Sequence, residues 1–268
     1  MTARATAGTT AWPICRIRFS ASVPAAAARY AEGIRMLHAP LAARRGGDHT
    51  GGEMTILSNP FLLDVEHTLG IQGGRVSEGH PYAYDLIKVW RRQYAYAIPT
   101  DDLVRRIAAD SPIVEVGAGL GYWAWLLRQA GAEVRATDCR PPAQYFDARG
   151  RLCVTPGRRP GRPNEWFDTR PAWTRVEVAE AAEAAAAAPE TAALLLVWPP
   201  YDDKMATAAL RAFRGAVVWY VGEGRGGACA DDAFFDELEE AWEPDELHAL
   251  IRFPGLRDWA GRWRRRPR

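Results

Sequence analysis

The sequence feature that most constrains the fold is a glycine-rich turn within residues 112–123. This stretch reads Pro-Ile-Val-Glu-Val-Gly-Ala-Gly-Leu-Gly-Tyr-Trp. Its short apolar run is typical of a buried parallel strand, and residues 123–129 are expected to open a helix. The alternate glycines let the backbone bend sharply and let a ligand lie against bare amides. Because the start of a helix adds unpaired N–H groups and a positive dipole end, the sequence predicts a nucleotide-type cofactor site here.

The residues around this turn indicate the kind of cofactor. A dinucleotide fingerprint, G-x-G-x-x-G/A, needs a small residue where this chain has Tyr122, whose ring is expected to block a pyrophosphate. Glu115 stands two residues before the first glycine, where an acid repels a phosphate but holds a cationic ligand. The pattern Glu-x-Gly-x-Gly-x-Gly resembles the first motif of class I S-adenosylmethionine-dependent methyltransferases. The resemblance implies an acid near the methionine moiety and a turn that faces the cofactor, with these cofactor-binding residues: Glu115, Gly117, Ala118, Gly119, Gly121 and Tyr122.

A second acidic residue agrees with this interpretation. Gly131 is expected to cap the helix, and residues 133–138 read as the next strand. Asp138 ends that strand, where a carboxylate accepts two hydrogen bonds from ribose hydroxyls. Cys139, which follows it, is expected at the cofactor too. The alternative is a nucleotide-free Rossmann-like core in which the glycine turn is only structural.

Composition excludes several classes of protein. The 268 residues are 48% hydrophobic and 25% charged, as in soluble globular proteins, and no apolar run approaches the ~20 residues of a membrane span. The net charge of +1 makes no overall case for nucleic acid. The four cysteines are widely spaced and have no histidine at ligand spacing, which predicts reduced thiols in the cytoplasm, no disulfide frame and no metal.

The N-terminal part divides into two expected regions. Residues 1–52 are rich in Ala, Arg, Gly, Ser and Thr, which predicts a disordered or non-native extension. An organellar transit peptide and a true start at Met54 are the alternatives, whereas the order of segments in a secretory signal is missing. Residues 53–102 are expected to form a helical cap, with an aromatic-rich helix over 80–96. A second helix is expected from Thr100, which is followed by two aspartates, to Ala109.

The remainder, residues 103–268, is expected to be the catalytic domain. Residues 139–171 are rich in proline and arginine and predict a long loop. Arg158, Arg159 and Arg162 of this loop, beside Trp166 and Trp173, suit an anionic or aromatic substrate, and a solvated charged loop is the alternative. Strands are expected at 173–178, 193–198 and 216–221, helices at 179–188, 205–213 and 231–242, and a terminal hairpin at 248–253 and 257–264.

This order of elements is similar to that of class I methyltransferases. The resemblance implies an α/β, Rossmann-like class I methyltransferase fold. Its sheet is expected to be mostly parallel and seven-stranded, with a terminal antiparallel hairpin and helices on both faces. In such open sheets ligands bind beyond the carboxyl ends of the strands.

The strand at 193–198 ends at Pro199-Pro200-Tyr201, in the same expected crevice as the glycine turn. This ending resembles the Asp/Asn-Pro-Pro-Tyr loop of methyltransferases that act on adenine and similar amines. The departure is Trp198, which stands in the first position and cannot accept the hydrogen bonds of an amine. A rigid Pro-Pro exit from a buried strand is the structural alternative. The catalytic residues expected from the resemblance are Pro199, Pro200, Tyr201 and Asp202, and Trp198 is expected at the cofactor.

These features together predict a methyltransferase that uses S-adenosylmethionine. The expected acceptor is a nitrogen or oxygen of a small molecule, with no membrane partner, and nothing favours one oligomeric state. Trp198 motivates one alternative, a non-catalytic protein that uses the fold for binding. A nucleic-acid amino-methyltransferase is the other alternative.

Overall fold

The computed structural model describes residues 57–77, 83–158, 166 and 170–267 of the chain. All of them belong to one compact unit, Pro40–Arg268. The expected extension 1–52, the start of the helix expected at residue 80, and Arg159 and Arg162 lie outside the described residues. Among the described helices, none is long and apolar enough to cross a membrane.

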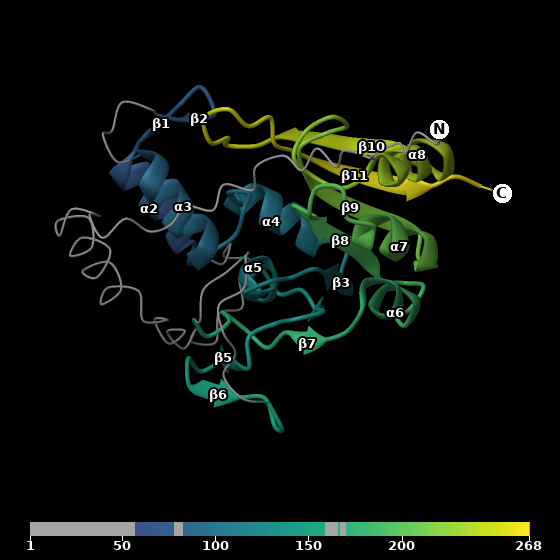
Figure 1. Ribbon diagram of the computed structural model, residues 1–268, viewed down its shortest axis with the longest axis horizontal. Coiled ribbons are helices and arrows are strands. Elements are labelled where there is room, and N and C mark those ends of the chain that lie inside the picture. Colours follow the sequence, from purple (N-terminus) through teal and green to yellow (C-terminus); the bar gives the residue numbers. More distant parts are fainter. Residues whose placement is uncertain (1–56, 78–82, 159–165, 167–169, 268) are drawn as a thin grey trace, which may run out of the picture. The chain divides into compact units, whose positions relative to one another are not determined.

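A seven-stranded sheet forms the centre of the fold (Figure 1), with the strand order β10-β11-β9-β8-β3-β4-β7. β3 pairs in parallel with β4 and β8, β8 with β9, and β4 with β7. β11 runs antiparallel to both β9 and β10. The sheet is therefore mostly parallel with a terminal antiparallel hairpin, which confirms the predicted Rossmann-like class I methyltransferase fold. The strands are β3 (Ile113–Val116), β4 (Val134–Asp138), β7 (Glu177–Val178), β8 (Ala193–Val197), β9 (Val217–Gly222), β10 (Trp242–Ala249) and β11 (Trp259–Arg265).

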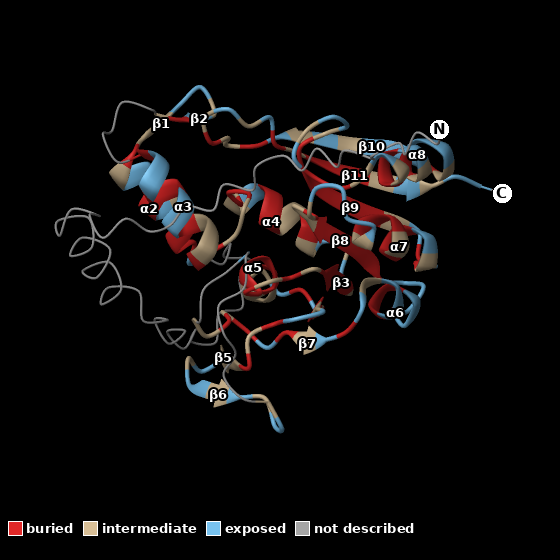
Figure 2. Cartoon of the chain, viewed as in Figure 1, coloured by how far each residue is buried: buried red, intermediate tan, exposed pale blue. Residues whose placement is uncertain are grey.

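Helices cover both faces of this sheet because the central strands are apolar on both sides. In β8, Leu195 packs in the core on one face, whereas Leu194 and Leu196 pack in the core on the other. Figure 2 shows these central strands as buried. The first core contains residues of α2 (Pro60–Thr68), α3 (Ala83–Gln93), α4 (Asp101–Ala108) and α5 (Tyr122–Gln129), and the second contains residues of α6 (Ala181–Ala186), α7 (Met205–Ala212) and α8 (Asp232–Ala241).

Short polar side chains begin three of these helices. Thr100 caps α4 as predicted, since its hydroxyl accepts the Leu103 N–H at 3.4 Å. Asn59 and Asp231 cap α2 and α8 in the same way. The helix α2 and the small hairpin of β1 (Ile71–Gln72) and β2 (Arg75–Val76) were not expected from the sequence.

The region between β4 and α6 differs from its prediction in two ways. The strand expected at 173–178 is reduced to the two residues of β7. Trp173 instead donates its indole N–H to the Gln93 carbonyl at 2.8 Å and its backbone N–H to Leu120. The expected loop 139–171 contains a two-stranded hairpin, β5 (Gln144–Phe146) with β6 (Leu152–Val154).

The terminal hairpin is displaced from its predicted position. Helix α8 ends at Ala241 and β10 follows it directly, so the strand predicted at 248–253 is wrong beyond Ala249. β10 lies at the edge of the sheet, and Trp242 is its only buried residue, so its sequence lacks the regular apolar alternation of a half-buried strand. The pairing with β11 places Glu243 opposite Arg264 and Glu246 opposite Arg262.

A buried ion pair ties this hairpin to the centre of the sheet. The Arg262 guanidinium, 6% exposed, donates two hydrogen bonds of 2.7 Å to the two carboxylate oxygens of Asp110, just before β3. Trp219 in β9 donates its indole N–H to the same carboxylate at 2.7 Å. Burial alone would raise the pKa of Asp110, but the hydrogen bonds from Arg262 and Trp219 outweigh it and lower that pKa. Arg262 also pairs with Asp245 in β10.

We expect Arg262→Ala to lower the free energy of unfolding by about 3–5 kcal/mol, because the Asp110 carboxylate, 14% exposed, loses its ion-pair partner and keeps the hydrogen bond from Trp219. Urea denaturation at neutral pH measures this loss. The matched control is Arg264→Ala, which removes an arginine that also contacts Asp245 but is 61% exposed, and should cost below about 1 kcal/mol. Equal small losses in the two variants would contradict this account of the hairpin.

Candidate functional site

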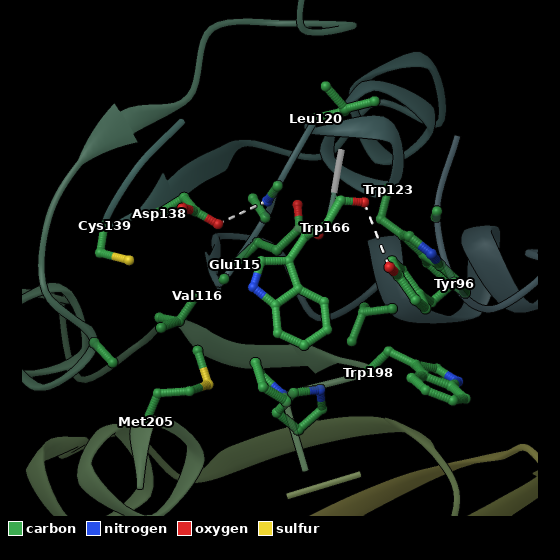
Figure 3. Close-up of a pocket in the computed structure, with 18 of the residues that line it drawn as sticks. Tyr96, Glu115, Val116, Leu120, Trp123, Asp138, Cys139, Trp166, Trp198 and Met205 are labelled. Carbon is green, nitrogen blue, oxygen red and sulfur yellow. Dashed lines mark hydrogen bonds between the residues drawn. The ribbon is translucent and has the colours of Figure 1, made fainter. Parts of the chain in front are cut away.

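A pocket of about 310 Å³ opens at the carboxyl ends of β3, β4 and β8, where ligands bind in open α/β sheets. Its walls come from the glycine turn after β3, from the residues that follow β4 and β8, and from the segment that ends α3 and continues beyond it. Figure 3 shows Asp138 and Cys139 on one side of the pocket and Tyr96 and Trp198 on the opposite side, with the Trp166 indole between them. The volume is in the range of small-ligand sites.

The three glycines of the turn all have positive φ, from +54° at Gly119 to +76° at Gly117. Residues other than glycine rarely adopt this backbone region. A Cβ at Gly117 would lie 2.8 Å from Cε of Met205, so this glycine keeps the pocket open. Gly121, which was expected to bind the cofactor, instead faces the residues before β7. It does not line the pocket, and its Cβ would lie 2.8 Å from Val176 Cγ2, so it allows α5 to pack closely on residues 174–176.

Glu115 lies in β3, at the centre of the sheet, and borders the pocket while only 2% exposed. Burial raises the pKa of its carboxyl to about 8, although the charge of Arg128 and a hydrogen bond from the Ala124 backbone act in the opposite direction. Its Oε2 atom is buried and has no hydrogen-bond partner. An acceptor in this state costs free energy unless a donor reaches it. A ligand in the pocket is placed to supply that donor.

Asp138 ends β4 on the other side of the glycine turn. Its Oδ2 accepts the Gly119 N–H at 3.0 Å and its Oδ1 accepts the Arg140 N–H at 2.8 Å. Because each carboxylate oxygen has two acceptor positions, one on each oxygen has no partner among the described residues, and Asp138 lines the pocket. Cys139, which is exposed, lines the same wall.

Tyr122 begins α5, and its ring is part of the pocket wall. The side chain is 1% exposed, and its hydroxyl points into the core, where it donates to Asn59 Oδ1 at 2.8 Å and accepts the Phe61 N–H at 3.0 Å. Its ring packs in a cluster with the rings of Phe61, Tyr94, Trp125 and Trp173. Tyr122 thus connects the helical cap to the glycine turn.

Only some of the residues that follow β8 line the pocket. Trp198, Pro199 and Pro200 line it, whereas Tyr201, 68% exposed, and Asp202 lie outside the lining. The Pro199 carbonyl, expected to face a substrate, accepts the Ala230 N–H at 3.0 Å. Asp203 lines the pocket and accepts the Met205 N–H.

Trp173, which the sequence offered as a substrate contact, and Glu223 both have structural roles. Trp173 belongs to the aromatic cluster around Tyr122. Glu223 is 7% exposed, and its carboxylate accepts the backbone N–H groups of Ala228 and Arg257, each at 2.8 Å. It holds two loops together and does not line the pocket.

Sequence reasoning missed a cation at this site. Arg91, in the last turn of α3, lines the pocket and lies near the rings of Tyr96 and Trp198. The sequence predicted that Arg91 lies on a helix. It did not predict that this helix packs near the end of β8, which is what brings Arg91 to Trp198. Among the described residues, no group of three or more His, Cys, Asp or Glu side chains is arranged to hold a metal ion.

Comparison with known proteins gives matches in structure only. No family model matches the sequence, and no curated protein is significantly similar to it. The structure is similar to a magnesium protoporphyrin IX methyltransferase (ChlM) from Synechocystis PCC 6803 with bound SAM, at 13% identity and a TM-score of 0.41 over 78% of this chain and 93% of that one. It is also similar to a TehB-like SAM-dependent methyltransferase from Corynebacterium glutamicum, at 16% identity and a TM-score of 0.40 over 69% and 98% of the chains. A third is the N-methyltransferase NodS from Bradyrhizobium japonicum, at 15% identity and a TM-score of 0.34 over 62% and 94%. The fold assignment rests on the sheet order and register described above.

Proposed function

We propose that the chain is a methyltransferase that binds S-adenosylmethionine in this pocket and methylates a small molecule. The observation that carries the proposal is the buried, unpartnered Oε2 atom of Glu115, placed beside the glycine turn. A donor that carries positive charge would relieve both the missing hydrogen bond and the cost of ionising this carboxyl. The ammonium group of the methionine moiety is such a donor.

The other residues of this side fit the rest of the cofactor. The open acceptor positions of Asp138 suit the two ribose hydroxyls. The backbone of Gly117, Ala118 and Gly119 lines the pocket between the two carboxylates, where only glycine leaves room for close approach. Beyond Asp138, the wall continues through Cys139 and the residues 179–181.

In the proposed reaction the chain mainly positions and desolvates the acceptor. S-adenosylmethionine held in the pocket would supply an activated methyl group: an acceptor lone pair forms a bond to the methyl carbon as the carbon–sulfur bond breaks, and S-adenosylhomocysteine leaves. The chain contributes by holding the acceptor in line and by excluding water, which converts a bimolecular step into an oriented one. Tyr96 and Trp198, which line the part of the pocket opposite Asp138, would position the acceptor in this way. A neutral amine needs no strong base, whereas a hydroxyl acceptor needs one.

A small acceptor is supported by the pocket volume of about 310 Å³ and by the net charge of +1. A non-catalytic binding protein is a second candidate, because Trp198 replaces the expected acceptor residue and donates its indole N–H to Asp258 at 2.9 Å. Amino-methylation of nucleic acid is a third candidate, and the engaged Pro199 carbonyl disfavours it.

We expect the chain to bind S-adenosylmethionine and S-adenosylhomocysteine, and Asp138→Ala and Glu115→Gln each to weaken binding by about tenfold or more, because each removes a charged acceptor. Isothermal titration calorimetry measures both. Glu133→Gln is the matched control for Glu115→Gln, since it makes the same change at an exposed site outside the pocket. Absence of binding by the unmodified chain at millimolar ligand would sink the proposal. Binding without turnover on any acceptor pool would favour the non-catalytic candidate.

The pH dependence of stability gives an independent check on Glu115. Its pKa is about 8 in the folded protein, whereas an unperturbed glutamate has a pKa of 4.5. Between pH 4.5 and 8, the folded state therefore holds a proton that the unfolded state has lost. The free energy of unfolding of the ligand-free protein should therefore fall by about 1.4 kcal/mol per pH unit as pH rises within this window. Burial also raises the pKa of Asp258, to about 6, so Asp258 adds to this slope near pH 6, and Glu115 dominates it from pH 7 to 8.

Urea denaturation of Glu115→Gln across pH 7 to 8 should lose this slope, and Glu133→Gln should retain it. The same Glu115→Gln protein should be more stable than the unmodified chain at pH 8, because it has no buried carboxyl to ionise. A slope that is the same in all three proteins would show that Glu115 does not titrate in this window.

A further inference from the structure

The acceptor side of the pocket contains one cation among aromatic rings. The Cζ atom of Arg91 lies 5.6 Å from the centroid of the Tyr96 ring, 5.4 Å from that of Trp198 and 5.4 Å from that of Phe253. Rings at these distances attract a guanidinium through their negative faces. They hold the Arg91 side chain in place but leave its hydrogen-bond donors unused.

Arg91 makes no hydrogen bond or ion pair with any residue that the structure describes, and its Nε atom is buried. Burial lowers the pKa of Arg91, although the charge of Asp258 acts in the opposite direction. The two nearest carboxylates are committed elsewhere. Asp258 accepts the indole N–H of Trp198, and Glu223 accepts two backbone N–H groups. A partly buried guanidinium without an acceptor is a binding site for an anion, because an arginine fork matches a carboxylate in shape and charge.

Flat rings border the pocket beside this cation. The ring centroids of Tyr96 and Trp198 are 5.4 Å apart, and the angle between the ring planes is 32°. For Trp166 and Tyr96 the centroid distance is 6.1 Å and the interplanar angle is 66°. All three rings line the pocket. Tyr96 and Trp198 lie on the side opposite Asp138, and Trp166 lies between the two sides (Figure 3). Such rings favour a planar ligand that stacks on one face or meets an edge.

The orientation of Trp198 is fixed by its backbone and by its indole nitrogen. Its φ is +50°, in the left-handed region, and its backbone N–H donates to Val221 at 2.7 Å. Its indole N–H donates to Asp258 at 2.9 Å, and Asp258 is 2% exposed. Where related loops place a hydrogen-bond acceptor, this chain therefore places a rigid aromatic surface.

We propose that the methyl acceptor is a planar aromatic carboxylate, whose ring packs against Trp198 and Tyr96 and whose carboxylate binds Arg91. This inference rests on the proposed methyltransferase function and names its class of acceptor. The negative charge of such a substrate would lie beside Arg91, on the side of the pocket opposite Asp138. The two carboxylates Glu115 and Asp138 then serve the cofactor on the other side.

The test compares pairs of aromatic probes that differ only in charge. Binding of 2-aminobenzoate and 4-hydroxybenzoate is measured against their carboxamides by ligand-observed NMR, in the presence of S-adenosylhomocysteine, with cyclohexanecarboxylate as the non-aromatic acid. We expect each aromatic acid to bind about tenfold or more tightly than its amide and than the non-aromatic acid. Equal binding of acid and amide would overturn the inference.

Variants identify the residue responsible. Arg91→Met should abolish the preference for acid over amide, and Arg91→Lys should retain part of it, because lysine keeps the charge but not the planar fork. Lys88→Met, on the same helix and 58% exposed, is the control and should change nothing. Thermal unfolding of Arg91→Met shows whether the variant is folded; a small decrease in its midpoint is expected, because the guanidinium contacts with three rings are lost but no hydrogen bond with a described residue is. A preference that survives in Arg91→Met would overturn the inference.

Failure of this inference is distinguishable from failure of the proposed function. Arg91→Met should bind S-adenosylhomocysteine as the unmodified chain does, because Arg91 lies on the side away from Asp138. Cofactor binding without any preference for aromatic acids would overturn the acceptor class alone. No cofactor binding by the unmodified chain would overturn the function on which it rests.

Discussion

The site depends on a carboxyl group buried in the middle of a parallel sheet. Glu115 in β3 lies opposite Ala136 of β4 and Leu195 of β8, so neighbouring strands enclose it on both sides. The turn of positive-φ glycines that follows gives the chain room to reverse into α5, whose backbone contributes a hydrogen bond to the same carboxyl. The cost of burying this acid is offset only in part by these groups. The fold thus holds a buried acid in a state that a bound cationic ligand would stabilise.

Charge divides the pocket into two sides with different chemistry. Glu115 and Asp138, on either side of the glycine turn, offer acceptors suited to a cationic, hydroxyl-bearing cofactor. Arg91, Tyr96 and Trp198 offer a cation and flat rings on the opposite side. A methyl donor and an acceptor held in this way would meet between the ends of β3 and β8. The buried pair of Asp110 and Arg262 stabilises the hairpin that completes the sheet beyond β9.

Local signals in the sequence predicted the centre of the fold but not its periphery. The glycine turn, the uniformly apolar β8 and the Thr100 cap were readable because a few adjacent residues determine each of them. The edge strand β10 was not readable, because only its first residue, Trp242, is buried and the strand shows no regular apolar alternation. Gly121 was assigned to the cofactor and instead allows close packing on residues 174–176, which depends on long-range contacts. The role of Arg91 likewise depends on how α3 packs beside the end of β8.

The most direct test of the central claim is the number of protons exchanged when S-adenosylmethionine binds at pH 7. Calorimetric titration in two buffers of different ionisation enthalpy gives this number. With a pKa of about 8 in the free protein, Glu115 holds a proton at this pH and must lose it to face the ligand's ammonium group. The expected result is a release of about one proton by the unmodified chain and none by Glu115→Gln. Binding with no proton release, or with the same release in the variant, would contradict the claim that Glu115 receives the cofactor.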